Sequence, residues 1–215
     1  MLRGLWRAYE RQLAANRVRT QMATSCFLWG AGDVLAQRIE HYEAQNKGFT
    51  IDQRRTLLTA VGFGAVFVGP VGELWYSGLE KACRRLVPGG GARFLVTKVV
   101  LDSAVMGSMY VAAFFAFGSI VLEGNGLQGF LQKMKGDFVP TYAAELAVWP
   151  LVQTANFSYV PVRHQLLVVN TFSLLDAAFI SWAGNQHDWF GKIMGRLGLG
   201  DASRAAGAGG HIKEQ

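Results

Sequence analysis

Long apolar segments separated by short polar connections dominate the chain. Four of them approach the roughly 20 residues that a helix needs to cross a bilayer, and they cover 56–72, 103–122, 146–162 and 165–183. A fifth, weaker segment covers 20–37, where Asp33 interrupts the apolar run. This pattern predicts an all-α fold, a polytopic transmembrane helix bundle of four to five helices.

The first 19 residues predict a basic amphipathic helix. Arg3, Arg7 and Arg11 recur every four residues and share one side of the helix, while apolar and aromatic residues cover much of the rest. Such a helix lies at a membrane surface, but an organelle-targeting segment has the same Arg-rich pattern. The expected organisation is an interfacial helix or targeting segment at 1–19, a transmembrane helical domain at 20–190, and a Gly- and Ala-rich tail at 191–215 whose end is disordered.

Polar stretches and prolines mark the expected connections. Residues 38–55, 81–93 and 123–137 are interpreted as loops between the apolar segments. Pro70 lies inside an apolar run, where proline kinks or ends a helix turn, and Pro150 is expected to break a helix. Pro161 separates the last two segments, which we expect to form a tight helical hairpin.

Small residues recur in three of the apolar segments. In membranes such stripes allow helix backbones to approach closely, because lipid provides no hydrophobic drive between helices. They therefore predict a closely packed bundle, and they comprise Gly62, Gly64, Ala65 and Gly69; Ala104, Ser108, Ala112 and Ala116; and Ser173, Ala177 and Ser181.

Composition fits a small membrane protein whose charges are confined to loops and ends, and it fits a large buried soluble core less well. Hydrophobic residues make up 51% of the 215 residues and charged residues 17%, with a formal net charge of +6. A basic balance favours anionic partners, and the apolar content points to lipid headgroups rather than nucleic acid. Cys26 and Cys83 are expected to be unpaired thiols. The sequence has no phosphate-binding, metal-binding or nucleophile motif, so we expect no enzyme activity, no cofactor and no metal.

Charged residues in apolar segments are the candidate functional residues, because each costs on the order of 2.5–3.5 kcal/mol to insert into a membrane. The acids outnumber the bases, which suggests a water-filled path that favours cations or polar solutes. The alternative is that each acid pairs with an Arg near a helix end or lies at the interface. These candidates are Asp33, Glu73, Asp102, Glu145 and Asp176, with Lys98, Arg163 and His164.

Three finer expectations concern neighbouring side chains. Lys98 and Asp102 are four residues apart and can pair on one helix. Gln153 and Asn156 share a helix face, where they line a hydrated path or form interhelical hydrogen bonds. The aromatic residues Trp75, Tyr76 and Trp182 are interpreted as interfacial anchors.

The run WPLVQTANFSYVP resembles the W-P-x-x-Q-x-x-N-F-x-x-V-P motif of the Mpv-seventeen and peroxisomal-membrane-protein family. Two further blocks agree in order, one at Gly32, Asp33 and Gln37 and one that begins at Asp52. The chain departs from the family pattern at Glu73, where His is usual, and at Asp176, where Trp is usual. The matching motif positions are Trp149, Pro150, Gln153, Asn156, Phe157, Val160 and Pro161.

The resemblance implies a small multi-pass protein of the mitochondrial inner membrane, with a peroxisomal or plastid membrane as the alternative. It implies a channel or pore for small solutes that supports mitochondrial metabolite and DNA homeostasis. A non-catalytic structural or accessory subunit of a larger membrane complex is the second interpretation. The partners expected are the lipid bilayer, small solutes, and further copies of the chain or a membrane complex.

Overall fold

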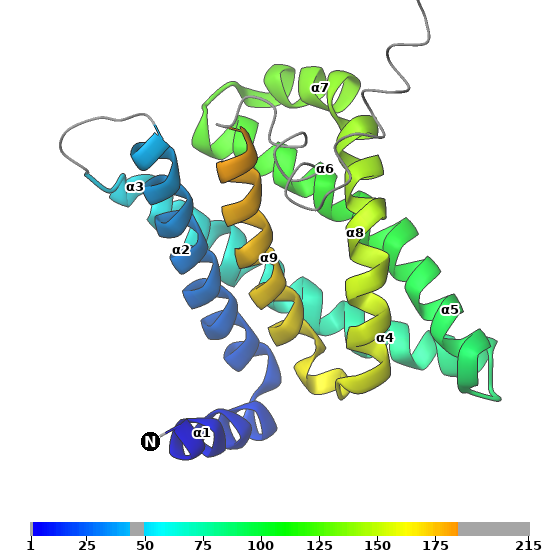
Figure 1. Ribbon diagram of the computed structural model, residues 1–215. Helices are drawn as coiled ribbons and strands as arrows, with labels where there is room; N and C mark the ends of the chain where they lie inside the picture. The colour runs from blue at the N-terminus through cyan, green and yellow to red at the C-terminus, as the bar shows by residue number, and fades with distance from the viewer. Residues whose placement is uncertain (1, 44–49, 185–215) are drawn as a thin grey trace, which may run out of the picture.

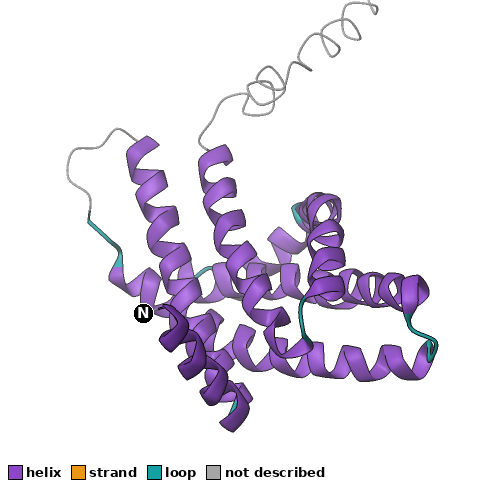
Figure 2. Ribbon diagram, turned by 60° about the horizontal axis from the view of Figure 1, so that its bottom comes forward, coloured by secondary structure: helices purple, strands orange, loops and turns teal. Residues whose placement is uncertain are grey.

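The computed structural model describes residues 2–43 and 50–184, and every regular element in these ranges is helical (Figure 2). The all-α prediction is therefore confirmed for the described chain. The α-helices are α1 (Leu2–Ala15), α2 (Arg17–Glu43), α3 (Gln53–Leu57), α4 (Gly69–Leu86), α5 (Gly91–Leu101), α6 (Ser108–Ala116), α7 (Gly126–Gly136), α8 (Phe138–Tyr159) and α9 (Val162–Gly184). Segments of π-helix join several of them, at Leu58–Val68 (η1), Asp102–Gly107 (η2) and Phe117–Leu122 (η3).

These π-helical joints merge shorter helices into two long ones. The continuous helices Gln53–Leu86 and Gly91–Leu122 are long and apolar enough, by length and composition, to cross a membrane. They contain the first two predicted spans. The last two predicted spans fall in the second half of α8 and in α9, while the weak fifth segment lies within α2.

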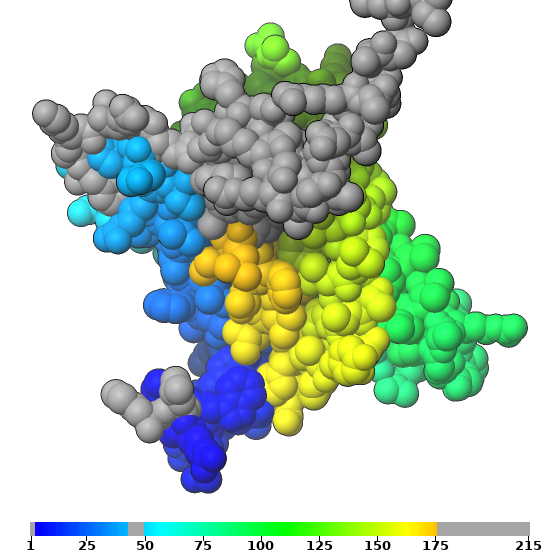
Figure 3. Space-filling model, in the orientation of Figure 1, coloured from blue at the N-terminus to red at the C-terminus, as the bar shows by residue number. Residues whose placement is uncertain are grey.

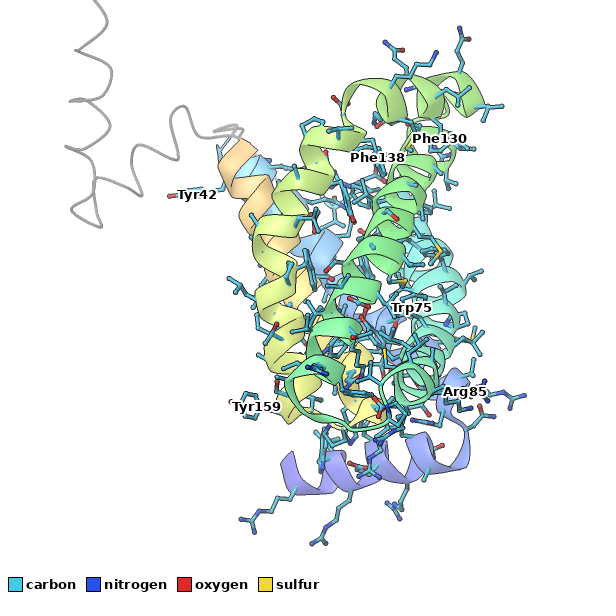
Figure 4. The ribbon with its side chains drawn as sticks, turned by 90° about the vertical axis from the view of Figure 1, so that its right-hand side faces the viewer. Tyr42, Trp75, Arg85, Phe130, Phe138 and Tyr159 are labelled. Carbon is cyan, nitrogen blue, oxygen red and sulfur yellow. The ribbon has the colours of Figure 1, made fainter. Side chains whose placement is uncertain are left out.

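Figure 1 shows how the helices are arranged. α2 lies beside α9, and α8 runs antiparallel to α9 after the short connection through Pro161. The predicted helical hairpin is thus confirmed. α1 and α7 lie across the two opposite ends of the bundle in both Figure 1 and Figure 4.

The distribution of polarity is inverted relative to a soluble protein. Among the described residues, more of the buried side chains are polar or charged than apolar. Large apolar side chains such as Val66, Leu74 and Leu151 are more than 60% exposed on the outside of the helices. Since a soluble fold buries such residues, this outer surface suits lipid, and the polar interior supplies the hydrogen bonds that lipid cannot.

Glycines allow the close packing that the sequence predicted in the first long helix. A Cβ at Gly64 would lie 2.8 Å from the carbonyl oxygen of Ser25, and one at Gly69 would lie 2.7 Å from the Cα of Met22. Both contacts are with α2. In the second stripe Ala104 is exposed, whereas Ser108, Ala112 and Ala116 are half-buried. The Ser108 hydroxyl donates to the Ala104 carbonyl of its own helix.

Two expectations about chain breaks are wrong. α8 runs through Pro150 without ending, because proline's fixed φ is helical and only one backbone donor is lost. Likewise, the stretch read as the loop 123–137 contains the helix α7. The signal was present in Leu127, Phe130, Leu131 and Met134, which are spaced as one apolar face of a helix.

Candidate functional site

Asp102 is the centre of a buried polar network. Its carboxylate accepts hydrogen bonds from Trp75 Nε1 and Gln153 Nε2, each at 2.7 Å. Gln153 also donates to the hydroxyl of Tyr76 at 3.0 Å. Three helical segments meet here, since Trp75 and Tyr76 lie on α4, Asp102 begins η2, and Gln153 lies on α8.

The same network continues toward the α8–α9 turn. Asn156 donates to Gln153 Oε1 at 2.9 Å and to the backbone carbonyl of Gln165 at 3.3 Å. The Gln165 side-chain oxygen accepts from Lys98 Nζ at 3.2 Å, and Lys98 also pairs with Glu80 at 2.8 Å. The interhelical hydrogen-bonding interpretation of Gln153 and Asn156 is therefore confirmed.

Contrary to the expectation, Lys98 does not pair with Asp102. Its side chain is 1% exposed and turns toward Glu80 on α4, with Nζ 4.3 Å from the ring centroid of Phe157. The ion pair, the amide of Gln165 and the aromatic face together compensate a fully desolvated ammonium. Spacing along one helix missed this arrangement, because the carboxylate partner lies on a neighbouring helix.

A second network joins α2 to the start of the first long helix. Arg55 bridges two acids of α2, with Nε 2.9 Å from Asp33 and a guanidinium nitrogen 2.9 Å from Glu40. Gln37 and Thr56 each donate to the other Asp33 oxygen at 2.7 Å. Asp33 therefore fits the alternative in which a buried acid pairs with an arginine near a helix end.

Glu73 has a similar environment at the other end of α2. Its carboxylate accepts from Ser77 at 3.0 Å and pairs with Arg17 at 3.2 Å. Gln21 on α2 contacts it at 3.4 Å. Thus Glu73, like Asp33, is an acid compensated by an arginine at a helix terminus.

α1 is attached to the bundle at this end. Glu10 lies 2.8 Å from His164 and 3.5 Å from Arg163, both at the start of α9, and the rings of Trp6 and Tyr9 pack against His164. Figure 3 shows α1 against the end of α2 and the α8–α9 turn. Burial and the nearby charges of Glu10 and Glu73 raise the pKa of the Tyr9 phenol above its ordinary value.

Two neighbouring cavities lie between the helices. A cavity of about 70 Å³ adjoins Asp102 and Gln153. A larger one of about 460 Å³ extends to Asp33, Glu40 and Arg55. The two cavities share five lining residues, which are Tyr110, Glu145, Trp149, Asn170 and Ser173.

The predicted candidates are thus divided between these features. Asp102, Glu145, Gln153 and the motif residue Trp149 line the smaller cavity, and Asp33 lines the larger one. Glu73, Lys98 and Asn156 are buried in the polar networks. Asp176 lies in α9 beyond Leu175, the last residue whose side chain is described, as do Ala177, Ser181 and Trp182.

The structure also corrects the role of two aromatic residues. Tyr76 is 3% exposed and Trp75 donates to Asp102, so neither is an interfacial anchor. By contrast, Tyr42 and Tyr159 point away from the bundle in Figure 4. The family motif residue Phe157 packs against Tyr76 with ring centroids 6.1 Å apart.

Several residues of these networks were not among the sequence candidates. Glu80, Arg55 and Glu40 lie just outside the apolar segments, so the cost of charge in a membrane did not single them out. Asn170 interrupts an apolar segment and was a detectable signal; it donates to Ser25 at 2.7 Å and lines both cavities. Cys26 and Cys83 are unpaired, as predicted. Within the described residues, no group of three His, Cys, Asp or Glu side chains could hold a metal ion.

Comparison with known proteins identifies a family and several relatives of the chain. The model of the Mpv17 / PMP22 family matches residues 120–181, which include the hairpin of α8 and α9. The chain is 32% identical over 185 residues to the mitochondrial inner membrane protein Mpv17 of Xenopus laevis, covering 85% of this chain and 98% of that protein. It is 31% identical over 182 residues to the human protein of the same name, with the same coverage.

A fungal relative gives the same result. Protein sym1 of Aspergillus oryzae is 34% identical over 170 residues, covering 79% of this chain and 92% of that protein. No solved structure matches the chain. The names of the animal relatives confirm the predicted location in the mitochondrial inner membrane. The buried motif of α8 and α9 and these identities together lead to one conclusion, that the chain belongs to the Mpv17 / PMP22 family of membrane proteins.

Proposed function

We propose that the protein is a non-catalytic channel for small polar solutes, with a preference for cations, in the mitochondrial inner membrane. The observation that carries the proposal is the charge of the two bordering cavities. Their described lining residues include four acids, Asp33, Glu40, Asp102 and Glu145, and one base, Arg55. An excess of acids along a path between helices attracts cations and repels anions.

Glu145 has the central position in this proposal. It lines both cavities, so a solute that moves from one to the other passes its carboxyl group. Asp33 and Glu40 share Arg55, which reduces their net charge at the far end of the larger cavity. Asp102 and Glu145 are the acids that line the smaller cavity.

The test is single-channel recording of the purified full-length protein in a planar bilayer, with insertion checked by protease digestion. We expect stepwise conductance and a reversal potential that indicates cation preference under a salt gradient. Glu145→Gln should reduce that preference. The matched control is Glu123→Gln, because Glu123 is an exposed acid paired with Lys133 near α7 and lines neither cavity.

If correctly inserted protein produces no conductance, the channel proposal is wrong. That result would favour the second function, an accessory subunit of a membrane complex. The extensive apolar exterior, with Val66 62% and Leu151 74% exposed, offers a surface for that role as well as for lipid or further copies of the chain. Co-migration with a larger assembly on native gels would identify it.

A further inference from the structure

We propose that the cavity beside Asp102, together with the adjoining part of the larger cavity that shares five of its lining residues, binds a small organic cation, such as a quaternary or primary ammonium with an apolar body. This inference deepens the proposed function, on which it rests for the role of the cation as a transported solute. The binding itself is a separate claim and is tested separately. The aromatic walls of the cavity, its two acids and the fixed positions of these side chains favour such a ligand.

Aromatic rings form much of the wall of the smaller cavity. Phe67, Tyr76, Tyr110, Tyr142 and Trp149 all line it, and they come from four different helical segments. An aromatic face attracts a cation within about 6 Å of its centroid, and recognition of quaternary ammonium groups uses several such faces at once. The wall also carries side-chain oxygens, including those of Asp102, Glu145 and Gln153. The aromatic faces are what favour a cation with an apolar body over a hydrated inorganic one.

Two acids give this aromatic cavity a negative charge. Asp102 and Glu145 line it, and its described lining includes no Lys, Arg or His. The nearest buried ammonium, Lys98, is committed to Glu80 at 2.8 Å and lies outside the lining. Within the described residues Asp102 has no ion pair, only neutral donors from Trp75 and Gln153. A carboxylate oxygen accepts more than one hydrogen bond, so Asp102 retains capacity for a cationic ligand.

The groups that would contact the ligand are held in place. Tyr142 donates to the Ser103 carbonyl at 2.9 Å and stacks on Phe138 with ring centroids 5.8 Å apart. Asp102 is fixed by its two hydrogen bonds of 2.7 Å. A preformed site loses little conformational entropy on binding. Walls, charge and rigidity therefore suit a cation with methyl or methylene groups better than an anion or a neutral apolar molecule.

The first experiment compares choline with its uncharged isostere 3,3-dimethylbutan-1-ol. Binding is measured by equilibrium dialysis and calorimetry on the full-length protein in nanodiscs whose lipids contain no choline headgroups. We expect choline to bind at least ~10-fold more tightly, because only the cation gains from the aromatic faces and the carboxylates. Equal affinities for the two compounds, or no measurable binding of choline, would overturn the proposal.

Variants then assign the binding to this cavity. Glu145→Gln and Tyr142→Leu should each weaken choline binding by roughly 10-fold, whereas Tyr142→Phe should retain most of the affinity because it keeps the ring. Glu123→Gln and Tyr159→Leu are the matched controls, since Glu123 and the 86% exposed Tyr159 lie outside the cavity. The thermal unfolding of each variant shows whether it folds. Equal losses in the Tyr142→Leu and Tyr159→Leu proteins would contradict the assignment.

The ammonium group has two sources, a free amine or the headgroup of phosphatidylcholine. Repeating the dialysis in phosphatidylcholine nanodiscs distinguishes them, because a headgroup that enters the cavity competes with choline. The outcome also separates the two proposals. Choline binding by a protein that is silent in bilayers overturns the channel alone, and conductance without choline binding overturns the cation site alone.

Discussion

The indole nitrogen of Trp75 lies 2.7 Å from a carboxylate oxygen of Asp102, and the two residues belong to successive long helices. The hydrogen bond joins the middle of one apolar helix to the middle of the next. It also fixes the orientation of the acid that lines the smaller cavity. Where lipid surrounds the helices, such buried polar contacts have few competing partners and therefore specify which helices pack together.

Replacing Trp75 with Phe should destabilise the protein. The change keeps an aromatic ring but removes the donor, so one oxygen of the buried Asp102 loses its partner at a cost of about 1–3 kcal/mol. The measurement is the free energy of unfolding in detergent. Trp6→Phe is the control, because Trp6 is half-exposed on α1. Equal stabilities of the two variants would show that the Trp75 hydrogen bond contributes nothing.

The buried pair of Lys98 and Glu80 should be strongly coupled. Lys98→Met leaves a partly buried Glu80 with only the exposed Arg84 beside it, and we expect a loss of about 3 kcal/mol. The double variant Lys98→Met, Glu80→Gln should recover much of this loss, since no uncompensated charge remains. A double-mutant cycle by chemical unfolding measures the coupling.

The surface pair of Lys133 and Glu123 provides the control for that cycle. The Lys133 and Glu123 side chains are 35% and 42% exposed. Because water screens their interaction, the coupling energy of this pair should stay below about 1 kcal/mol. A Lys98–Glu80 coupling as small as this would mean that burial does not strengthen the pair.

Gly69→Ala should destabilise the contact between α2 and the first long helix. Its Cβ would lie 2.7 Å from the Cα of Met22, a backbone atom that cannot rotate away. Overpacking of this kind costs typically about 1–3 kcal/mol. At Gly78 a Cβ meets nothing within 4 Å, so Gly78→Ala should be neutral or stabilising by about 1 kcal/mol. Thermal unfolding of the two variants compares them directly, and similar shifts would refute the close contact.

Glu10→Gln should loosen α1 from the end of the bundle. The change removes the contacts of the carboxylate with His164 and Arg163 while keeping the size of the side chain. We expect faster amide hydrogen exchange in α1, with exchange in α4 and α8 unchanged. Glu123→Gln, at the opposite end of the bundle, serves as the control and should leave α1 protected. Unaltered exchange in the Glu10 variant would indicate that Leu13, which is 1% exposed, and the aromatic contacts suffice to hold the helix.

The sequence determined which segments form helices and that their apolar surfaces suit a membrane. Apolar runs near the spanning length, interrupted by few charges, require backbone groups to pair within each segment, and only a helix does this in a single segment. Pro161 ended α8 because the ring of a proline disfavours the helical conformation of the residue before it. Val160 is accordingly extended, at φ −106° and ψ 126°. The motif spacing of Gln153 and Asn156 placed both amides on one face, and that face is buried.

The tertiary structure decided which side chains pair with one another. Periodicity gives the side of a helix on which Lys98 lies but not the helix that faces it, so Glu80 and Gln165, 18 and 67 residues away, were not predicted. The same holds for Trp75 and Asp102, 27 residues apart. Rotation and crossing of packed helices determine such pairs, and with them which acids line a cavity and which are neutralised by arginine. These are properties of the assembled bundle, because they depend on distances between helices that no single segment specifies.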